Sequence, residues 1–200
     1  MLRDHVREHL LQQIEKGNLQ TEQTLNLAKI ARELNLSVTP VREALSQLEQ
    51  SEIVVSAPNR GFIIPNLNLN ILQDLYQTVS ELEVLVLDSL TESVAENFEV
   101  KTTVFTVKNR LEINKRLLQY GKNKVLQRLV LNLHTKIGFY EGIYLKDKLL
   151  TDSFLQQWDS IQNAVLEENI PTAKLLLKMN WISILELMEQ RVMLNQNVNF

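Results

Sequence analysis

The sequence predicts a mainly α-helical protein: an amino-terminal winged helix-turn-helix, built from three helices and a β-hairpin, followed by an all-α helical bundle. Three observations predict it. Apolar residues recur every three or four positions over most of the 200-residue chain. Two short β-branched runs stand on either side of a turn sequence near residue 60. The chain has five glycines and no cysteine, so no glycine-rich phosphate loop or disulfide framework is expected.

The chain before Ser37 predicts two helices. Apolar residues step by four from Leu2 to Ile14, and Gly17 follows as a natural stop. Apolar residues at i, i+3, i+4 and i+7 predict a shorter second helix over residues 27–34. Together these two helices would support the one that follows.

A third helix begins at Ser37, whose hydroxyl is expected to accept a hydrogen bond from a backbone N–H of the first turn. Pro40 falls in that turn, where a missing N–H costs least. An apolar line of Val41, Leu45 and Leu48 would hold the helix against the domain. The opposite face carries Thr39, Arg42, Glu43, Ser46 and Gln47. A face of this kind can enter the major groove of DNA.

Two strands are expected after this helix. The runs IVVSA (53–57) and FIIP (62–65) are rich in β-branched residues, and Pro58-Asn59-Arg60-Gly61 supplies the turn between them. The hairpin would flank the third helix as a wing. Residues 1–65 are therefore the predicted DNA-binding domain.

The polar segment NLNLN (66–70) is the predicted linker, and residues 71–200 are predicted as an all-helical effector-binding and dimerisation domain. Apolar periodicity there predicts five helices, which begin near Leu72, Val104, Leu126, Phe154 and Pro171.

Charge and composition exclude several functions. Residues 1–65 hold seven Lys/Arg against eight Asp/Glu, so DNA contact must come from the placement of a few basic side chains. Three scattered histidines, no cysteine and no GxSxG motif give no catalytic constellation, so an enzyme is not expected. His5 and His9 have a metal-compatible i, i+4 spacing, but without a third ligand they are interpreted as a solvated helix face.

No apolar run approaches the roughly 20 residues that cross a bilayer, so no membrane partner is expected. The absence of cysteine and of a signal peptide fits a cytoplasmic protein.

The segment SVTPVREALSQLEQSEIVVSAPNRGFIIP (37–65) closely resembles the signature of GntR-family transcription regulators. DLYQTVSELEVLVLDSL (74–90) resembles the opening of the FCD-type ligand domain of the FadR-like branch. The resemblance implies operator contact by the third helix and the wing. The predicted DNA-binding residues are Lys29, Arg32, Ser37, Thr39, Arg42, Ser46, Asn59, Arg60 and Gly61. Family members usually have arginine at the positions of Val38 and often of Ala28, so base readout should differ here.

FCD domains commonly bind a divalent metal through an Asp and three His, with an Arg nearby for a carboxylate ligand. The matching positions are Val130, His134, Trp158, Asn180 and, for the arginine, Val79. One ligand of four remains, so the resemblance implies that the metal site is lost and no cofactor is expected. An apolar effector pocket lined by these five residues, or a packed core, would replace it. His134 would then be a hydrogen-bonded core histidine.

The function that follows is a ligand-responsive repressor that binds double-stranded DNA at a palindromic operator as a homodimer, with an unknown small-molecule effector. The alternative is a helical-bundle interaction or assembly protein whose degenerate winged helix binds DNA weakly. The near-neutral charge of residues 1–65 and the missing arginines support the alternative.

Overall fold

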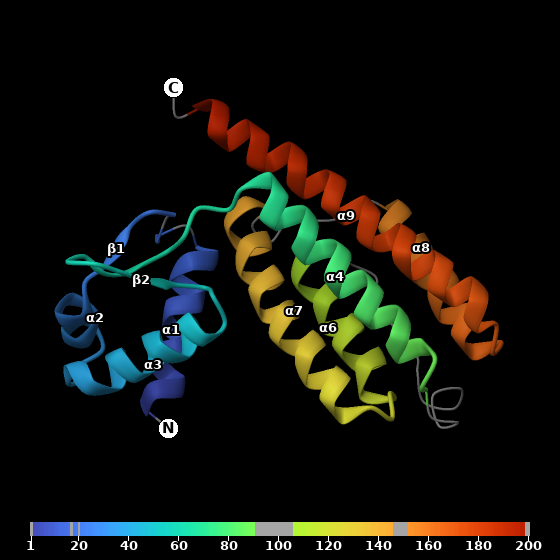
Figure 1. Ribbon diagram of the computed structural model, residues 1–200, viewed down its shortest axis with the longest axis horizontal. Helices are drawn as coiled ribbons and strands as arrows, with labels where there is room; N and C mark the ends of the chain where they lie inside the picture. The colour runs from blue at the N-terminus through green and yellow to red at the C-terminus, as the bar shows by residue number, and fades with distance from the viewer. Residues whose placement is uncertain (1, 17, 20, 91–105, 146–151, 199–200) are drawn as a thin grey trace. The chain divides into compact units, whose positions relative to one another are not determined.

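The computed structural model describes residues 2–16, 18–19, 21–90, 106–145 and 152–198 (Figure 1). The chain forms two compact units. Unit 1 contains Met1–Leu67 and Phe139–Lys146, and unit 2 contains Asn68–Gly138 and Asp147–Phe200. The predicted winged helix-turn-helix with helices after it is confirmed.

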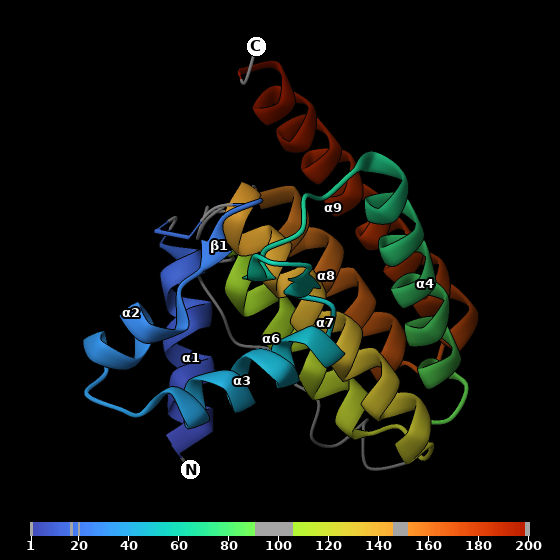
Figure 2. The ribbon, with the colours of Figure 1, turned by 60° about the vertical axis from the view of Figure 1, so that its left-hand side comes forward.

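The amino-terminal part of unit 1 has three helices and a small sheet. The helices are α1 (Leu2–Glu15), α2 (Leu27–Glu33) and α3 (Val38–Gln50), and the strands are β1 (Thr24–Leu25), β2 (Val55–Ala57) and β3 (Gly61–Ile63). Figure 2 shows α1 and α3 crossing one another. The core of this unit includes Val6 and Leu10 of α1 and the predicted line of α3, because Val41, Leu45 and Leu48 are all buried. Burial of an aliphatic side chain contributes about 1.5–3 kcal/mol, so this line is what holds α3 in place.

The two helix starts in this unit are capped differently. Asn26 accepts a hydrogen bond from the backbone N–H of Lys29 at 2.9 Å and so caps α2. Ser37 is the N-cap residue of α3, as predicted, but its hydroxyl makes no capping hydrogen bond. The prediction of that bond was wrong. The N-cap oxygen bonds to the second or third N–H of a helix, and the third residue of α3 is Pro40, which has none.

The sheet has three antiparallel strands in the order β1-β3-β2. Ser56 pairs with Phe62 in the predicted hairpin, and Leu25 pairs with the same Phe62 from the other side. The strand β1 was not predicted, because alternation over two residues carries no usable period. It makes β3 the central strand of the wing.

The turn between β2 and β3 needs a left-handed backbone at two positions. Asn59 has a φ of 61° and Gly61 a φ of 76°, a region that costs a residue with a Cβ about 1–2 kcal/mol. A Cβ on Gly61 would meet no atom of the described residues within 4 Å. The cost of a side chain there is therefore one of backbone conformation alone.

Gly61→Ala should lower the melting temperature by a few degrees, since about 1 kcal/mol shifts the midpoint of a chain of this size by about 2–4 °C. Thermal unfolding followed by circular dichroism would measure it. The exposed helix-end variant Gln50→Ala is the control and should melt within about 1 °C of the parent chain. An unchanged midpoint for Gly61→Ala would contradict the left-handed turn.

Unit 2 consists of helices. They are α4 (Leu69–Leu87), α6 (Val107–Gln119), α7 (Lys124–Tyr144, whose end lies in unit 1), α8 (Asp152–Leu166) and α9 (Ile170–Val198). All five predicted helices are present, although Val104, where the second was expected to begin, lies outside the described residues. None of the helices in the described residues is long and apolar enough to cross a membrane.

The helices α4 and α9 run antiparallel, side by side (Figure 1). Three side-chain pairs show the direction, because positions rise along α4 as they fall along α9: Gln73–Glu189, Glu81–Lys178 and Asp88–Lys174. The interior of the unit includes two fully buried indoles, Trp158 of α8 and Trp181 of α9.

Candidate functional site

The exposed residues of α3 and of its N-cap lie mainly at the amino-terminal half of the helix. Ser37, Val38, Thr39, Arg42 and Glu43 are all exposed. The i, i+3 and i+4 spacing from Thr39 places the last two on one side of the helix with it, opposite the buried line. Ser46, one turn further on, is half-buried.

Arg42 is the exposed basic residue of this face. Within the described residues it has no ion-pair or hydrogen-bond partner. Its five N–H donors are therefore available to phosphate oxygens or to a base edge. The Ser37 hydroxyl, which makes no capping bond, lies exposed at the same helix N-terminus. Backbone N–H groups at such a terminus favour an anion, so the start of α3 suits a phosphate.

The two basic residues of α2 that were predicted to contact DNA already interact with groups of their own helix. Lys29 lies 3.9 Å from the Glu33 carboxylate, and Arg32 Nε donates to the Ala28 carbonyl at 3.2 Å. The Lys29 and Glu33 side chains are 70% and 51% exposed, so the pair is weak and can exchange for a phosphate contact. Ala28, at a position where the family often has arginine, is exposed as well.

The wing is tied to the rest of unit 1 at both of its edges. Glu49 at the end of α3 accepts hydrogen bonds from the Ser56 backbone N–H at 3.0 Å and from its hydroxyl at 2.5 Å. Arg60 Nη2 donates to the Glu22 carbonyl at 3.3 Å and to the Thr24 hydroxyl at 3.5 Å. Asn59 and Gly61 lie exposed on either side of Arg60. The hairpin is thereby fixed relative to α3.

The helices α2 and α3 are joined by a short turn. Leu36 N–H donates to the Ala31 carbonyl at 2.8 Å, and Asn35 turns the chain with a φ of 53°. Two helices linked in this way, with an exposed second helix and an antiparallel hairpin beside it, define a winged helix-turn-helix domain.

Residues 2–64 match the family described as "Bacterial regulatory proteins, gntR family". This part of the chain is a GntR-family helix-turn-helix domain. No curated protein matches the chain at a significant level of sequence similarity.

Solved structures share the fold over nearly the whole chain. E. coli McbR/YncC is 17% identical with a TM-score of 0.72, covering 95% of this chain and 98% of that one. A putative GntR regulator from Rhodococcus sp. RHA1 is 16% identical with a TM-score of 0.73, covering 94% and 97%. A GntR-family regulator from Pseudomonas syringae pv. tomato str. DC3000 is 19% identical with a TM-score of 0.51, covering 100% and 89%. The chain thus has the fold of a GntR-family transcriptional regulator.

The five residues predicted to line an effector pocket are all in the interior of the helical unit. They come from four helices and are at most 1% exposed: Val79, Val130, His134, Trp158 and Asn180. Asn180 Nδ2 donates to Gln157 Oε1 at 3.1 Å. Three of their polar atoms, His134 Nδ1, Trp158 Nε1 and Asn180 Oδ1, have no hydrogen-bond partner within the described residues.

Sequence reasoning missed the centre of this interior, which is the carboxylate of Glu83 on α4, itself 3% exposed. Glu83 Oε1 lies 2.5 Å from His134 Nε2, and Asn114 Nδ2 donates to both carboxylate oxygens at 3.2 and 3.0 Å. Trp181 Nε1 donates to Oε2 at 2.6 Å. The Arg110 guanidinium carbon lies 4.6 Å from the centre of the Trp181 ring.

This cluster makes the interior around His134 polar. His134 is hydrogen-bonded in the core, but to a buried acid. The periodicity of α4 could have indicated that Glu83 is buried, since Glu83 continues the buried line of Leu72, Tyr76 and Val79 at helical spacing. A charged residue on a buried line must find partners, because an isolated buried charge is very costly.

The residues present do not fit the divalent metal of FCD domains. In the described residues no three or more His, Asp or Glu side chains are grouped to hold an ion. His134 Nε2 is already bonded to Glu83, and the other three matching positions are Val130, Trp158 and Asn180. The prediction of no bound cofactor stays open to metal analysis of the purified protein.

Proposed function

We propose that the protein is a DNA-binding transcription regulator that recognises its operator through α3 and the wing. The observation that carries this is Arg42, which lies exposed beside Thr39 with no partner among the described residues, on a helix whose other face is buried. The match of residues 2–64 to a family of regulators supports the same reading.

Each predicted contact has a distinct role. Arg42 and Thr39 would read base edges in the major groove, and Ser37 and Ser46 would bond to phosphates beside it. Lys29 and Arg32 would add phosphate contacts from α2. Asn59, Arg60 and Gly61 would bring the wing to the sugar-phosphate backbone of the DNA. Arg60 would exchange its contacts with Glu22 and Thr24 for contacts with phosphate oxygens.

The proposed assembly is a homodimer on a short inverted repeat. Two recognition helices related by a two-fold axis would meet successive major grooves about 34–36 Å apart. A dimer on such an operator blocks access to a promoter, so repression is the proposed outcome.

Control by a small molecule is proposed for the helical unit. Three buried atoms support it, His134 Nδ1, Trp158 Nε1 and Asn180 Oδ1, which find no hydrogen-bond partner in the part of the chain that the structure describes. Buried polar atoms are normally satisfied by protein, water or ligand. An effector bonded to them would shift the equilibrium between DNA-binding and non-binding arrangements by its difference in affinity for the two.

The salt dependence of binding tests the proposal against the alternative of an assembly protein. The DNA upstream of the gene that encodes the chain is titrated with the protein at 50 and at 200 mM salt, with fluorescence anisotropy as the readout. The affinity should fall by about 10³-fold between the two salt concentrations if about six phosphates are contacted. Negligible binding that does not change with salt would favour the assembly protein.

A further inference from the structure

Residues 106–136 are strongly basic, although the chain as a whole is acidic. They hold eight Lys/Arg and one Asp/Glu, whereas the rest of the chain holds thirteen Lys/Arg and twenty-three Asp/Glu. This segment comprises α6, the connection after it and the first part of α7. A local excess of one sign of charge attracts partners of the opposite sign.

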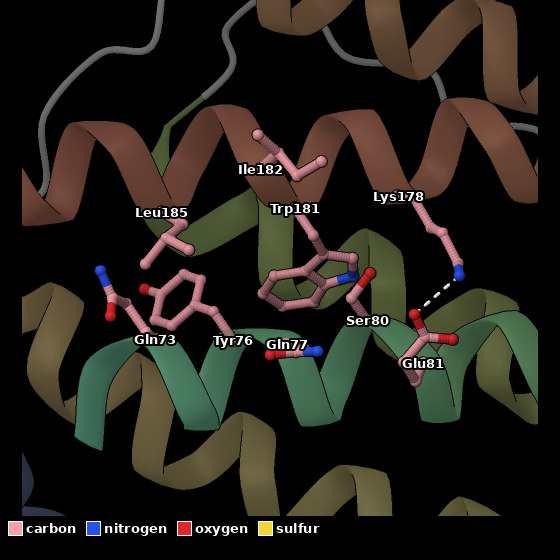
Figure 3. Close-up of a pocket in the computed structure, with 9 residues that line it drawn as sticks. All are labelled: Gln73, Tyr76, Gln77, Ser80, Glu81, Lys178, Trp181, Ile182 and Leu185. Carbon is pink, nitrogen blue, oxygen red and sulfur yellow. Dashed lines mark hydrogen bonds and ion pairs between the residues drawn. The ribbon is translucent and has the colours of Figure 1, made fainter. Parts of the chain in front are cut away.

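Four of these basic side chains are exposed and make no ion pair or hydrogen bond within the described residues. They lie at the end of α6, in the connection and at the start of α7: Arg116, Lys122, Lys124 and Arg128. The groove between α4 and α9 differs in this respect, because its lysine, Lys178, is paired with Glu81 at 2.7 Å (Figure 3). The basic side chains near the start of α7 can therefore bind an acidic group without first breaking an ion pair.

The start of α7 presents a basic ridge beside an apolar ridge. Lys124 and Arg128 are four positions apart, and so are Val125 and Leu129, which are 60% and 52% exposed. Residues four positions apart follow one another along a helix surface, so the two pairs form parallel ridges with a groove between them. Val130, on the opposite side of the helix, is fully buried. Both ridges therefore face outward from the helical unit.

Hydrogen bonds hold this part of α7 in place. The Asn123 side chain accepts from the Leu126 backbone N–H at 3.0 Å. Gln127 Nε2 donates to the carbonyls of Leu118 and Gly121, both at 2.6 Å. A surface that is fixed before binding loses less conformational freedom when a partner binds.

We propose that the surface formed by Lys124, Val125, Arg128 and Leu129, the α7 surface, binds a protein partner that presents an acidic amphipathic helix. The partner helix would have an apolar ridge and an acidic ridge, each with four-residue spacing. Its apolar side chains would contact Val125 and Leu129, and its carboxylates would pair with Lys124 and Arg128. This partner is additional to operator DNA, since the α7 surface contains none of the residues proposed to contact DNA.

The mixture of basic and apolar side chains favours a protein over other anionic partners. DNA contacts are mostly hydrogen bonds to phosphates and sugars, which would leave Val125 and Leu129 without an apolar partner. Segments that bind anionic lipid usually cluster about four to eight Lys/Arg, whereas the basic ridge of the α7 surface has two. An acidic amphipathic helix satisfies both ridges, and its charges fix how it aligns on them.

A designed helical peptide of about 18 residues, with one leucine ridge and one glutamate ridge at four-residue spacing, tests the α7 surface. The labelled peptide is titrated with the full chain, with fluorescence anisotropy as the readout. The parent chain should bind it, and Leu129→Ser and Arg128→Glu should each raise the dissociation constant tenfold or more. Lys16→Glu, the same reversal of charge at an exposed position outside the α7 surface, should change it less than twofold.

A reversal of specificity tests the charge pairing. The double variant Lys124→Glu, Arg128→Glu should bind a second peptide, in which lysine replaces each glutamate, at least tenfold more tightly than the parent chain does. Circular dichroism must first show that each variant is folded. If the double variant gained no affinity for the second peptide, pairing of the partner with Lys124 and Arg128 would be overturned.

Three further outcomes would overturn the proposal. The first is a parent chain that does not bind the acidic peptide. The second is equal binding of a peptide whose leucines are replaced by serine, which would reduce the interaction to unspecific attraction of charge. The third is binding of the parent chain, but not of Leu129→Ser, to vesicles that contain phosphatidylserine, which would assign the surface to a membrane. All three leave operator recognition by α3 untouched, because DNA affinity is measured separately.

Discussion

Replacing Arg42 by alanine should lower the affinity for operator DNA on the order of 100-fold or more. The guanidinium is exposed and unengaged in the described residues, on the face of α3 that also carries Thr39. A bidentate arginine–guanine contact contributes about 1–3 kcal/mol of discrimination, and a symmetric dimer makes each contact twice. Anisotropy titrations of the parent and the variant at a fixed salt concentration measure the change.

Arg128→Ala is the matched control for this prediction. Arg128 is also an exposed arginine, but it lies on α7 in the helical unit. Its removal should change affinity less than about threefold, because distant surface charges are largely screened. Equal losses for the two variants would mean that DNA binding depends only on total charge, and would contradict readout by α3.

Replacing Glu83 by alanine should destabilise the helical unit by about 3–5 kcal/mol. The change leaves the Trp181 N–H, the Asn114 amide and His134 without their shared acceptor inside the core. Removing one member of a buried polar network costs this much because the remaining groups stay buried and unpaired. For a chain of 200 residues the melting temperature should fall by roughly 10 °C or more, as measured by calorimetry.

Two variants control the Glu83 experiment. Glu112→Ala removes an acid that is 59% exposed and paired with Lys115, and it should cost less than about 1 kcal/mol. Glu83→Gln keeps the shape and one acceptor oxygen, so its loss should be intermediate. A Glu83→Ala chain that melts within 2 °C of the parent would contradict the role of Glu83 as the centre of the cluster.

The recognition helix could be predicted from sequence because its determinants are local. The line of Val41, Leu45 and Leu48 and the opposite polar face follow from periodicity over 13 residues, and the structure buries that line. The absence of a capping hydrogen bond from Ser37 could also have been predicted, since Pro40 removes the third N–H of the helix. The strand β1 was not, because a two-residue strand exists only through its pairing with β3.

The buried cluster of the helical unit could not be assembled from sequence. Its members come from α4, α6, α7 and α9, and Glu83 lies 98 positions from Trp181. Periodicity indicates which side of a helix is buried, so it could have singled out Glu83. It carries no information about which polar residues of other helices meet it. The same limit applies to α9, because its apolar periodicity does not show that Met179 and Ile182 are exposed.

Selection of binding sites from a random duplex library, run in parallel with the parent chain and with Arg42→Ala, tests the central claim most directly. The claim predicts that the parent enriches one inverted repeat with half-sites about one helical turn apart. The Arg42→Ala chain should lose that enrichment or change the preferred base within each half-site. If the parent enriched no sequence, or if both chains enriched the same one equally, recognition of DNA by α3 would be contradicted.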